Sequence, residues 1–190
     1  MNLDAISDVF RLVDRDAWVV TAAHAGHRGG LIATWVFQAS IDPENPVLVA
    51  GIAPNHYTRE LIDGSGAFAA HLIAENQLDV AWEFANHSGR AHDKFAHIAA
   101  QPGETGSTIL EDCIAYVEAR VIAQYDAGDR IFYWADVVAG RKLKDGASLT
   151  EQRLMSSANP EQQRQALSGR NHDIAIGRPL RRQWIGKAQG

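Results

Sequence analysis

Residues 30–58 read GLIATWVFQASIDPENPVLVAGIAPNHYT and contain two apolar, β-branched runs separated by a proline-rich segment. We predict strands over 31–40 and 46–52, because β-branched and aromatic side chains favour extended chain. The segment between them is predicted to be a loop, because Pro43 and Pro46 have no N–H to donate to a β-ladder. The two strands are therefore expected to pair antiparallel.

The rest of the chain also divides into apolar runs and turn residues. Capping signals and helical spacing predict helices over 3–13, 55–62, 76–85 and 150–167, with Asn2 and Asn55 as N-caps and an interruption at 159–160. Strands are expected over 17–23, 67–73, 114–124 and 130–138, turns at 24–30 and 125–129, a polar loop over 86–95, and short extended pieces at 173–176 and 183–185. Strands that do not alternate with helices favour a mainly β fold, a closed antiparallel barrel with peripheral helices.

The chain has 190 residues, of which 46% are hydrophobic and 22% charged. These values are typical of one globular domain, so we expect residues 1–190 to form a single unit. Cys113 is the lone cysteine, which excludes an intrachain disulfide. The sequence has no basic-then-apolar leader and no apolar run near the roughly 20 residues that a membrane helix needs. We therefore expect a cytoplasmic protein that does not contact membranes.

The C-terminal segment 151–190 differs in charge from the remainder. It has seven Lys and Arg against three Asp and Glu, which gives +4, whereas residues 1–150 have 11 against 20, which gives −9. Nucleic-acid binding is disfavoured, because no aromatic residues alternate with the basic ones to stack on bases. We interpret 151–190 as a basic, partly helical extension that covers an acidic surface of its own, meets a partner subunit or reaches an anionic cofactor.

Several common catalytic motifs are absent from the sequence. No GxGxxG follows a strand, the glycine-rich residues 26–30 lack the GK[ST] ending of a phosphate loop, and GxSxG does not occur. The eight histidines do not have the spacing of metal ligands, so no metal site is expected. Cys113 is interpreted as a small core residue.

Residues 30–95 resemble the flavin reductase-like domain family in the order and spacing of short motifs. The matching pieces are Ala33-Thr34-Trp35 followed by Gln38 and Ser40, Asp42-Pro43, the segment from Ala53 to Thr58, Gly66-Ala67-Phe68, Gln77-Leu78, Phe84 and Lys94-Phe95. The flavoredoxin-like and diflavin-flavoprotein-like branches are the most similar. Gly128-Asp129-Arg130 resembles the family's Gly-Asp-His hairpin, with arginine in place of histidine. The last forty residues match the family poorly.

The resemblance implies an FMN-binding split barrel of antiparallel Greek-key type, with FMN as cofactor and FAD as the other possible flavin. The implied cofactor-binding residues are Ala33, Thr34, Trp35, Gln38, Ser40, Ala53, Asn55, Tyr57, Thr58, Phe84, Ser88, Gly89 and Arg90. Elementary chemistry agrees, because backbone N–H groups near Thr34 can reach a flavin edge and a helix beginning near Asn55 favours a terminal phosphate. Several of these residues could instead have a purely structural role. Thr34 and Trp35 could be ordinary strand residues, Thr58 a helix cap and Phe84 a core residue. Gln38 and Ser40 could be solvated, and 88–90 could be an ordinary loop.

The implied activity is an oxidoreductase in which NAD(P)H reduces flavin, which passes electrons to free flavin, oxygen, iron or a protein acceptor. The alternative is a non-catalytic flavin or electron carrier, and a weaker third class is a pyridoxamine-phosphate-oxidase-like or haem-binding relative on the same barrel. Arg130 is the candidate residue beside the nicotinamide, and no side chain is expected to act as an essential acid or base. The family also implies a homodimer, for which Val36, Phe37, Trp134 and Trp184 supply surplus apolar surface.

Overall fold

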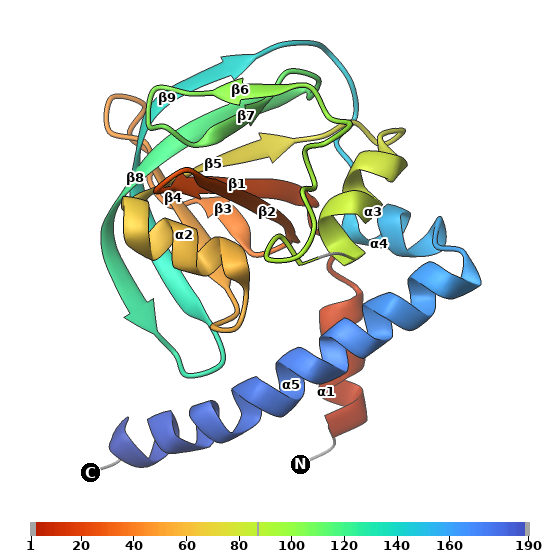
Figure 1. Cartoon of the computed structure of the whole chain (residues 1–190). Helices are drawn as coiled ribbons and strands as arrows, with labels where there is room; N and C mark the ends of the chain where they lie inside the picture. The colour runs from red at the N-terminus through yellow and green to blue at the C-terminus, as the bar shows by residue number, and fades with distance from the viewer. Residues whose placement is uncertain (1–2, 87, 189–190) are drawn as a thin grey trace.

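The structure is a computed structural model that describes residues 3–86 and 88–188. Its strands are β1 (Trp18–His24), β2 (His27–Ala33), β3 (Val36–Gln38), β4 (Val47–Ile52), β5 (Ala67–Leu72), β6 (Ala100–Pro102), β7 (Thr108–Leu110), β8 (Ala115–Asp126) and β9 (Ile131–Lys142). The short strands β6 and β7, which the sequence pattern did not predict, pair with each other. The other seven form one curled sheet in the order β2-β1-β5-β8-β9-β4-β3 (Figure 1).

Every neighbouring pair in the large sheet is antiparallel. The connection from β4 to β5 crosses the β8–β9 hairpin, which is a Greek-key feature and not an up-and-down order. These observations confirm the predicted class of an antiparallel barrel with peripheral helices. The ladder begins at β2 and ends at β3, so the cylinder is split between two strands that follow each other in the chain and is not closed by hydrogen bonds.

The predicted turn over 24–30 is wrong, because most of these residues belong to the β1–β2 hairpin. His24 pairs with His27, and Ala25 and Gly26 make a two-residue turn with φ of 50° and 80°. Two positive φ values match the right-handed twist of the strands, which explains a glycine at this position. The predicted strand over 31–40 is also interrupted, because β2 ends at Ala33 and β3 begins at Val36.

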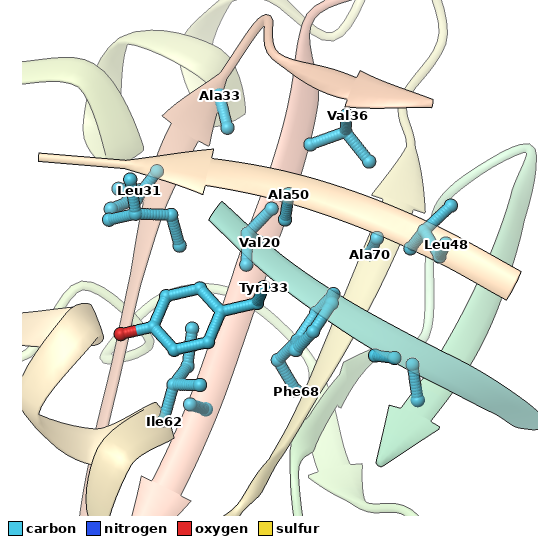
Figure 2. Packing of buried hydrophobic residues seen from close by; sticks show 14 of the residues in the cluster. Val20, Leu31, Ala33, Val36, Leu48, Ala50, Ile62, Phe68, Ala70 and Tyr133 are labelled. Carbon is cyan, nitrogen blue, oxygen red and sulfur yellow. The ribbon is translucent and has the colours of Figure 1, made fainter. Parts of the chain in front are cut away.

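The inner face of the sheet surrounds one hydrophobic core (Figure 2). Val20, Leu31, Phe68 and Tyr133 fill it from four different strands, between small alanines that let the curled sheet close tightly. The Tyr133 hydroxyl donates a hydrogen bond to Asp63 Oδ1 at 2.6 Å. Burial and this contact raise the pKa of Tyr133 well above its ordinary value. The core is thereby tied to the helix that follows β4.

The helices are α1 (Leu3–Arg11), α2 (Tyr57–Ser65), α3 (Leu78–Asn86), α4 (Glu151–Ser156) and α5 (Pro160–Ala188). The interruption predicted near 159–160 is confirmed, with Pro160 as the first residue of α5. The first helix ends at Arg11, before the predicted 13, and the proposed cap Asn2 lies outside the described residues. The helix predicted over 55–62 begins at Tyr57 after His56, so Asn55 is not its N-cap.

The C-terminal extension is more helical than the sequence suggested. Residues 173–176 and 183–185, predicted as extended, both lie inside α5, which runs along one side of the molecule (Figure 1). Glycines and Pro179 weaken the local helical signal, but contacts with the β8–β9 hairpin stabilise the helix there. None of the described helices is long and apolar enough to cross a membrane.

Candidate functional site

A cavity of about 370 Å³ opens where the chain passes from β2 to β3. Thr34 and Trp35 lie in this passage, and the Trp35 ring stacks on Phe132 of β9 with centroids 6.2 Å apart and an interplanar angle of 13°. The Trp35 carbonyl accepts a hydrogen bond from Gly51 N at 2.8 Å, which fixes the backbone of the passage against β4. A cavity of this size, with a stacked aromatic pair in its wall, is large enough for a small organic ligand.

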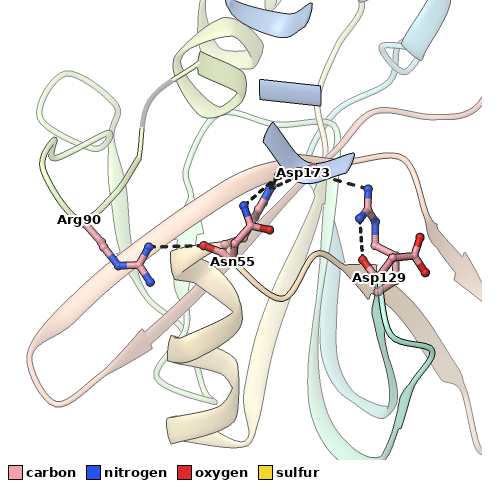
Figure 3. A network of polar contacts seen from close by, with 6 residues as sticks. Asn55, Arg90, Asp129 and Asp173 are labelled. Carbon is pink, nitrogen blue, oxygen red and sulfur yellow. Dashed lines mark hydrogen bonds and ion pairs between the residues drawn. The ribbon is translucent and has the colours of Figure 1, made fainter. Parts of the chain in front are cut away.

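The polar centre of the site is Asp173 of α5, which points between α2 and the β8–β9 hairpin (Figure 3). Its Oδ1 accepts a hydrogen bond from Asn55 Nδ2 at 2.9 Å, and its Oδ2 lies 3.0 Å from His56 Nε2. Arg130 Nη2 lies 4.0 Å from the same Oδ2. Because a carboxylate oxygen only accepts hydrogen bonds, Nε2 of His56 carries the hydrogen in this contact.

The surroundings of Asp173 keep its carboxyl group ionised. Its side chain is 17% exposed, and this burial by itself would raise its pKa. The hydrogen bonds from His56 and Asn55 and the charge of Arg130 outweigh the burial, so the pKa of Asp173 lies below its ordinary value. Asn55 and His56 therefore bind a carboxylate by hydrogen bonds, and Arg130 adds a positive charge beside it.

Arg130 joins the polar centre to the aromatic cavity. Its guanidinium carbon lies 4.9 Å from the centroid of the Trp35 ring, within the range of a cation–π contact. Its Nη1 donates a hydrogen bond to Asp129 O at 2.7 Å, which holds the side chain against the hairpin tip. Arg130 thus links the cluster around Asp173 to Trp35, one of the residues that line the cavity.

The loop after α3 closes the other side of this site. Arg90 pairs with Glu60, donates to Asn55 O at 3.4 Å and lies 5.4 Å from the Tyr57 ring centroid. A Cβ atom on Gly89 would lie 3.1 Å from the same ring, so the loop approaches α2 closely. Lys94 anchors the loop by donating to Gly30 O and Phe84 O at 2.8 and 2.9 Å.

The beginning of α2 supplies further donors to the site. His56, the N-cap, makes no side-chain capping hydrogen bond, and its backbone is extended. The first turn of a helix has N–H groups without intrahelical partners and carries the positive end of the helix dipole. Arg59 in this turn pairs through Nη2 with Asp63 Oδ2 at 3.1 Å, and its buried Nε has no hydrogen-bond partner among the described residues. This end of α2 is therefore suited to a negatively charged group.

Comparison with known proteins assigns the chain to a family. The family model for the flavin reductase like domain matches residues 10–155. The chain belongs to that family. The matched segment includes the barrel and excludes α5, which agrees with the poor resemblance of the last forty residues.

Relatives of this flavin reductase-like domain include larger proteins. The chain is 32% identical to a Nostoc sp. (strain PCC 7120) protein that carries the name diflavin flavoprotein A 6, over 71% of this chain and 24% of that protein. The chain thus spans about a quarter of the length of the curated relatives that it matches first.

Solved structures share the fold of the domain. An FMN-binding protein from Thermus thermophilus has a TM-score of 0.63 and 27% identity, with 68% of this chain and 73% of that chain covered. A flavoredoxin from Methanosarcina acetivorans has a TM-score of 0.64 and 21% identity, with 68% and 69% covered.

The structure brings together most of the residues that the sequence assigned to the cofactor. Thr34 and Trp35 line the cavity, and Asn55 donates to Asp173. Tyr57 lies against Gly89 and Arg90, and Arg90 in turn donates to Asn55 O. Ser88 is exposed in the same loop, where its Oγ accepts a hydrogen bond from Arg90 N at 3.4 Å.

Other assigned residues lie beneath or beyond this surface. Ala33, Ala53 and Phe84 are buried, and Thr58 is only 2% exposed, so a ligand could reach its hydroxyl only if neighbouring side chains moved. Gln38 and Ser40 lie at the other end of β3, where they bond to each other and to the turn before β4. The structure thus places these two outside the group of contacts that surrounds Asp173.

Three residues of the site were missed in the sequence. Phe132 reads as an ordinary strand residue, and only the register that pairs it with Gly51 places it against Trp35. His56 lies beside the expected cap Asn55 and was passed over among eight histidines. Asp173 is the lone acid after Glu161 in a basic segment, a signal that could have drawn attention to it.

The described residues fit FMN, whose planar ring, hydroxylated chain and terminal phosphate need different surroundings. The Trp35–Phe132 cavity suits the ring, and the donors of Asn55, His56 and Arg90 suit the phosphate. Asn55 Oδ1 is a buried acceptor without a partner among the described residues, as a hydroxylated chain would require. One feature opposes the fit, since Asp173 already occupies donors that the phosphate would use.

Proposed function

We propose that this flavin reductase-like domain is an FMN-dependent oxidoreductase that is reduced by NAD(P)H. The observation that carries the proposal is Arg130, which contacts Trp35 in the wall of the cavity and also lies beside the anion-binding cluster. The Thermus thermophilus protein, described as FMN-binding, supports the choice of flavin. FMN is preferred over FAD because the start of α2 suits a terminal phosphate.

Bound FMN would supply the chemistry by accepting a hydride from the nicotinamide and releasing electrons to an acceptor. The chain's own residues bind and orient. Backbone groups at Thr34 and Trp35 would position the ring edge, and donors from Asn55, His56 and Arg90 would hold the phosphate. Arg130 would place a positive charge near the ring, where it favours the reduced, anionic form. No side chain is required as an acid or base.

A second candidate is a flavoprotein that carries electrons and is reduced by a protein partner. Two contacts favour it: the Arg130 guanidinium covers the Trp35 ring, and α5 lies against the hairpin that contains Arg130. Together they restrict access for a nicotinamide ring on the side where the family has histidine. The greater length of the diflavin relatives agrees with an acceptor or donor outside this domain.

We also propose a homodimer, in which a second copy covers the cavity. Phe37, which lines it, is 52% exposed, and Trp134 on the neighbouring outer sheet face is 38% exposed. Ile6, Val9 and Phe10 of α1 are exposed as well, and the segment directly after α1 also lines the cavity. Val36 and Trp184, which were also expected to supply interface surface, do not do so. Val36 lies in the core, and Trp184 packs against Tyr125. The cytoplasm remains the proposed location, because the single cysteine is free.

Anaerobic reduction separates the two candidates. FMN-loaded wild type and Arg130→His are mixed with NADH and with NADPH, and the loss of visible flavin absorption is followed by stopped flow. We expect at least one nucleotide to reduce the wild type, since Arg130 can reorient toward a nucleotide phosphate. Reduction of Arg130→His alone would identify an electron carrier in which arginine blocks the nicotinamide. Reduction of both proteins by dithionite but by neither nucleotide would exclude the nicotinamide reaction.

A further inference from the structure

Asp173 occupies the position in which the site binds an anion. Its carboxylate accepts hydrogen bonds from Asn55 Nδ2 and His56 Nε2 and lies 4.0 Å from the Arg130 guanidinium. These donors come from the start of α2 and from β8–β9, whereas Asp173 comes from a helix outside the family-matched segment. The site is thus filled by a group that belongs to the C-terminal extension and not to the barrel.

The middle and end of α5 contact the barrel chiefly around this carboxylate and at the hairpin tip. A Cβ on Gly177 would lie 2.8 Å from Asp129 Cβ, so helix and hairpin touch there. Arg181 donates to Ala127 O at 3.0 Å, and Trp184 packs edge-on against Tyr125. Most other residues of this helix are exposed, and its interior contains Pro179, which has no N–H to donate.

We propose that α5 is a self-inhibitory strap, whose Asp173 carboxylate must leave Asn55, His56 and Arg130 before a phosphomonoester such as that of FMN can bind there. The proposal rests on the proposed flavin function for the identity of that ligand. A phosphomonoester carries more negative charge than a carboxylate and has three acceptor oxygens, so it can satisfy the same donors. In the absence of this ligand, the strap keeps Asn55, His56 and Arg130 paired with Asp173.

The expected effect follows from competition within one molecule. A tethered group acts at a high effective concentration, and the apparent affinity for a ligand falls with the fraction of molecules in which the site is open. Charge-assisted hydrogen bonds are strong enough that removing the Asp173 charge should tighten FMN binding by about ten- to a hundredfold. If Asp173 instead positioned the donors for the ligand, the same change would weaken binding.

Two variants of the full chain release the strap by different means. Asp173→Asn keeps the size of the side chain and removes its charge, whereas Gly177→Leu forces α5 away from Asp129. Gly169→Leu is the matched control, because a Cβ at Gly169 meets no described atom within 4 Å. Affinity for FMN is measured by fluorescence quenching. Amide hydrogen exchange over 169–184 reports whether α5 is bound to the barrel, and it is measured once with added FMN and once with added inorganic phosphate.

We expect tighter FMN binding in Asp173→Asn and Gly177→Leu, unchanged binding in Gly169→Leu, and faster exchange over 169–184 when either probe is added to the wild type. Equal affinity for FMN in all four proteins, or slower exchange on binding, would overturn the strap and leave the flavin assignment intact. If no protein binds FMN but phosphate still speeds exchange, the strap stands and the flavin assignment fails. If neither probe changes exchange or binds, both are rejected.

Discussion

His71 is a buried polar residue whose two ring nitrogens join separate parts of the fold. Nδ1 donates to Val19 O at 2.9 Å, and Nε2 accepts from Leu110 N at 3.2 Å. These roles require the neutral ring, because a protonated ring has no acceptor nitrogen. Burial lowers the pKa of His71 to about 4, although the contact with Val19 and the charge of Glu118 act in the opposite direction. The residue therefore links β1 and β7 only while it is uncharged.

Acid should destabilise the protein through His71. Below about pH 6.5 the unfolded chain binds a proton at this residue, whereas the folded chain does not until about pH 4. The folded state should therefore lose about 3 kcal/mol from this group as the pH falls across that window. Urea unfolding of wild type and of His71→Gln, which cannot titrate, should show a steeper pH dependence in the wild type. Identical slopes in the two proteins would contradict this account.

The loop between α3 and β6 depends on Lys94. This buried ammonium group binds the carbonyls of Gly30 and Phe84 and lies 5.6 Å from the Phe84 ring centroid. Burial lowers the pKa of Lys94 to about 8, and nearby Glu83 partly offsets this. The side chain joins β2, α3 and the loop that includes Gly89 and Arg90, so it stabilises one wall of the candidate site.

Replacing Lys94 with methionine should weaken both folding and binding. The change keeps the apolar stem but leaves two buried carbonyls without a donor, which costs about 1–3 kcal/mol for each group left unpaired. Lys142→Met is the control, because Lys142 is exposed and pairs only with Asp145 on the surface. Urea denaturation and FMN titration of both variants check the expectation. Equal stability of the two would show that Lys94 does not anchor the loop.

The elements differ in how far the sequence could predict them. Strands rich in β-branched residues, such as β4, were predicted closely because their signal is local. The first half of β2 was mistaken for part of a turn, because its glycines weaken a strand pattern that cross-strand pairing restores. Most of α5 was missed, because its stability depends on contacts such as Gly177 against Asp129. The site could not be predicted in full for the same reason, because Asp173 and Asn55 are 118 positions apart in the chain and meet only in the folded structure.

At the scale of the whole molecule, α1 presents an apolar surface that the other described residues leave uncovered. Phe10 is 63% exposed and Leu12, directly after the helix, is 82% exposed. Exposed apolar residues in this number are unusual on a monomer and typical of an interface. The segment that follows lines the same cavity as Phe37, so a second copy bound here would also shelter the candidate site.

Light scattering should therefore give a mass near twice the 20.8 kDa of one chain. Phe10→Glu should shift the protein toward the monomer, because it places a charge in an apolar interface. Arg11→Gln changes the charge of α1 by the same amount at an exposed position and should leave the mass unchanged. A wild-type mass of one chain at micromolar concentration would contradict the homodimer.

FMN binding underlies both the proposed reaction and the proposed role of Asp173, and it can be measured by calorimetric titration. We expect one FMN per chain, with affinity reduced about tenfold or more in Asn55→Ala and Arg90→Ala, which remove side chains proposed to hold the phosphate. Gln38→Ala, which lies at the far end of β3, should bind FMN as the wild type does. Absence of saturable binding in both the wild type and Asp173→Asn, or affinity unchanged by Asn55→Ala and Arg90→Ala together, would contradict the proposed flavin site.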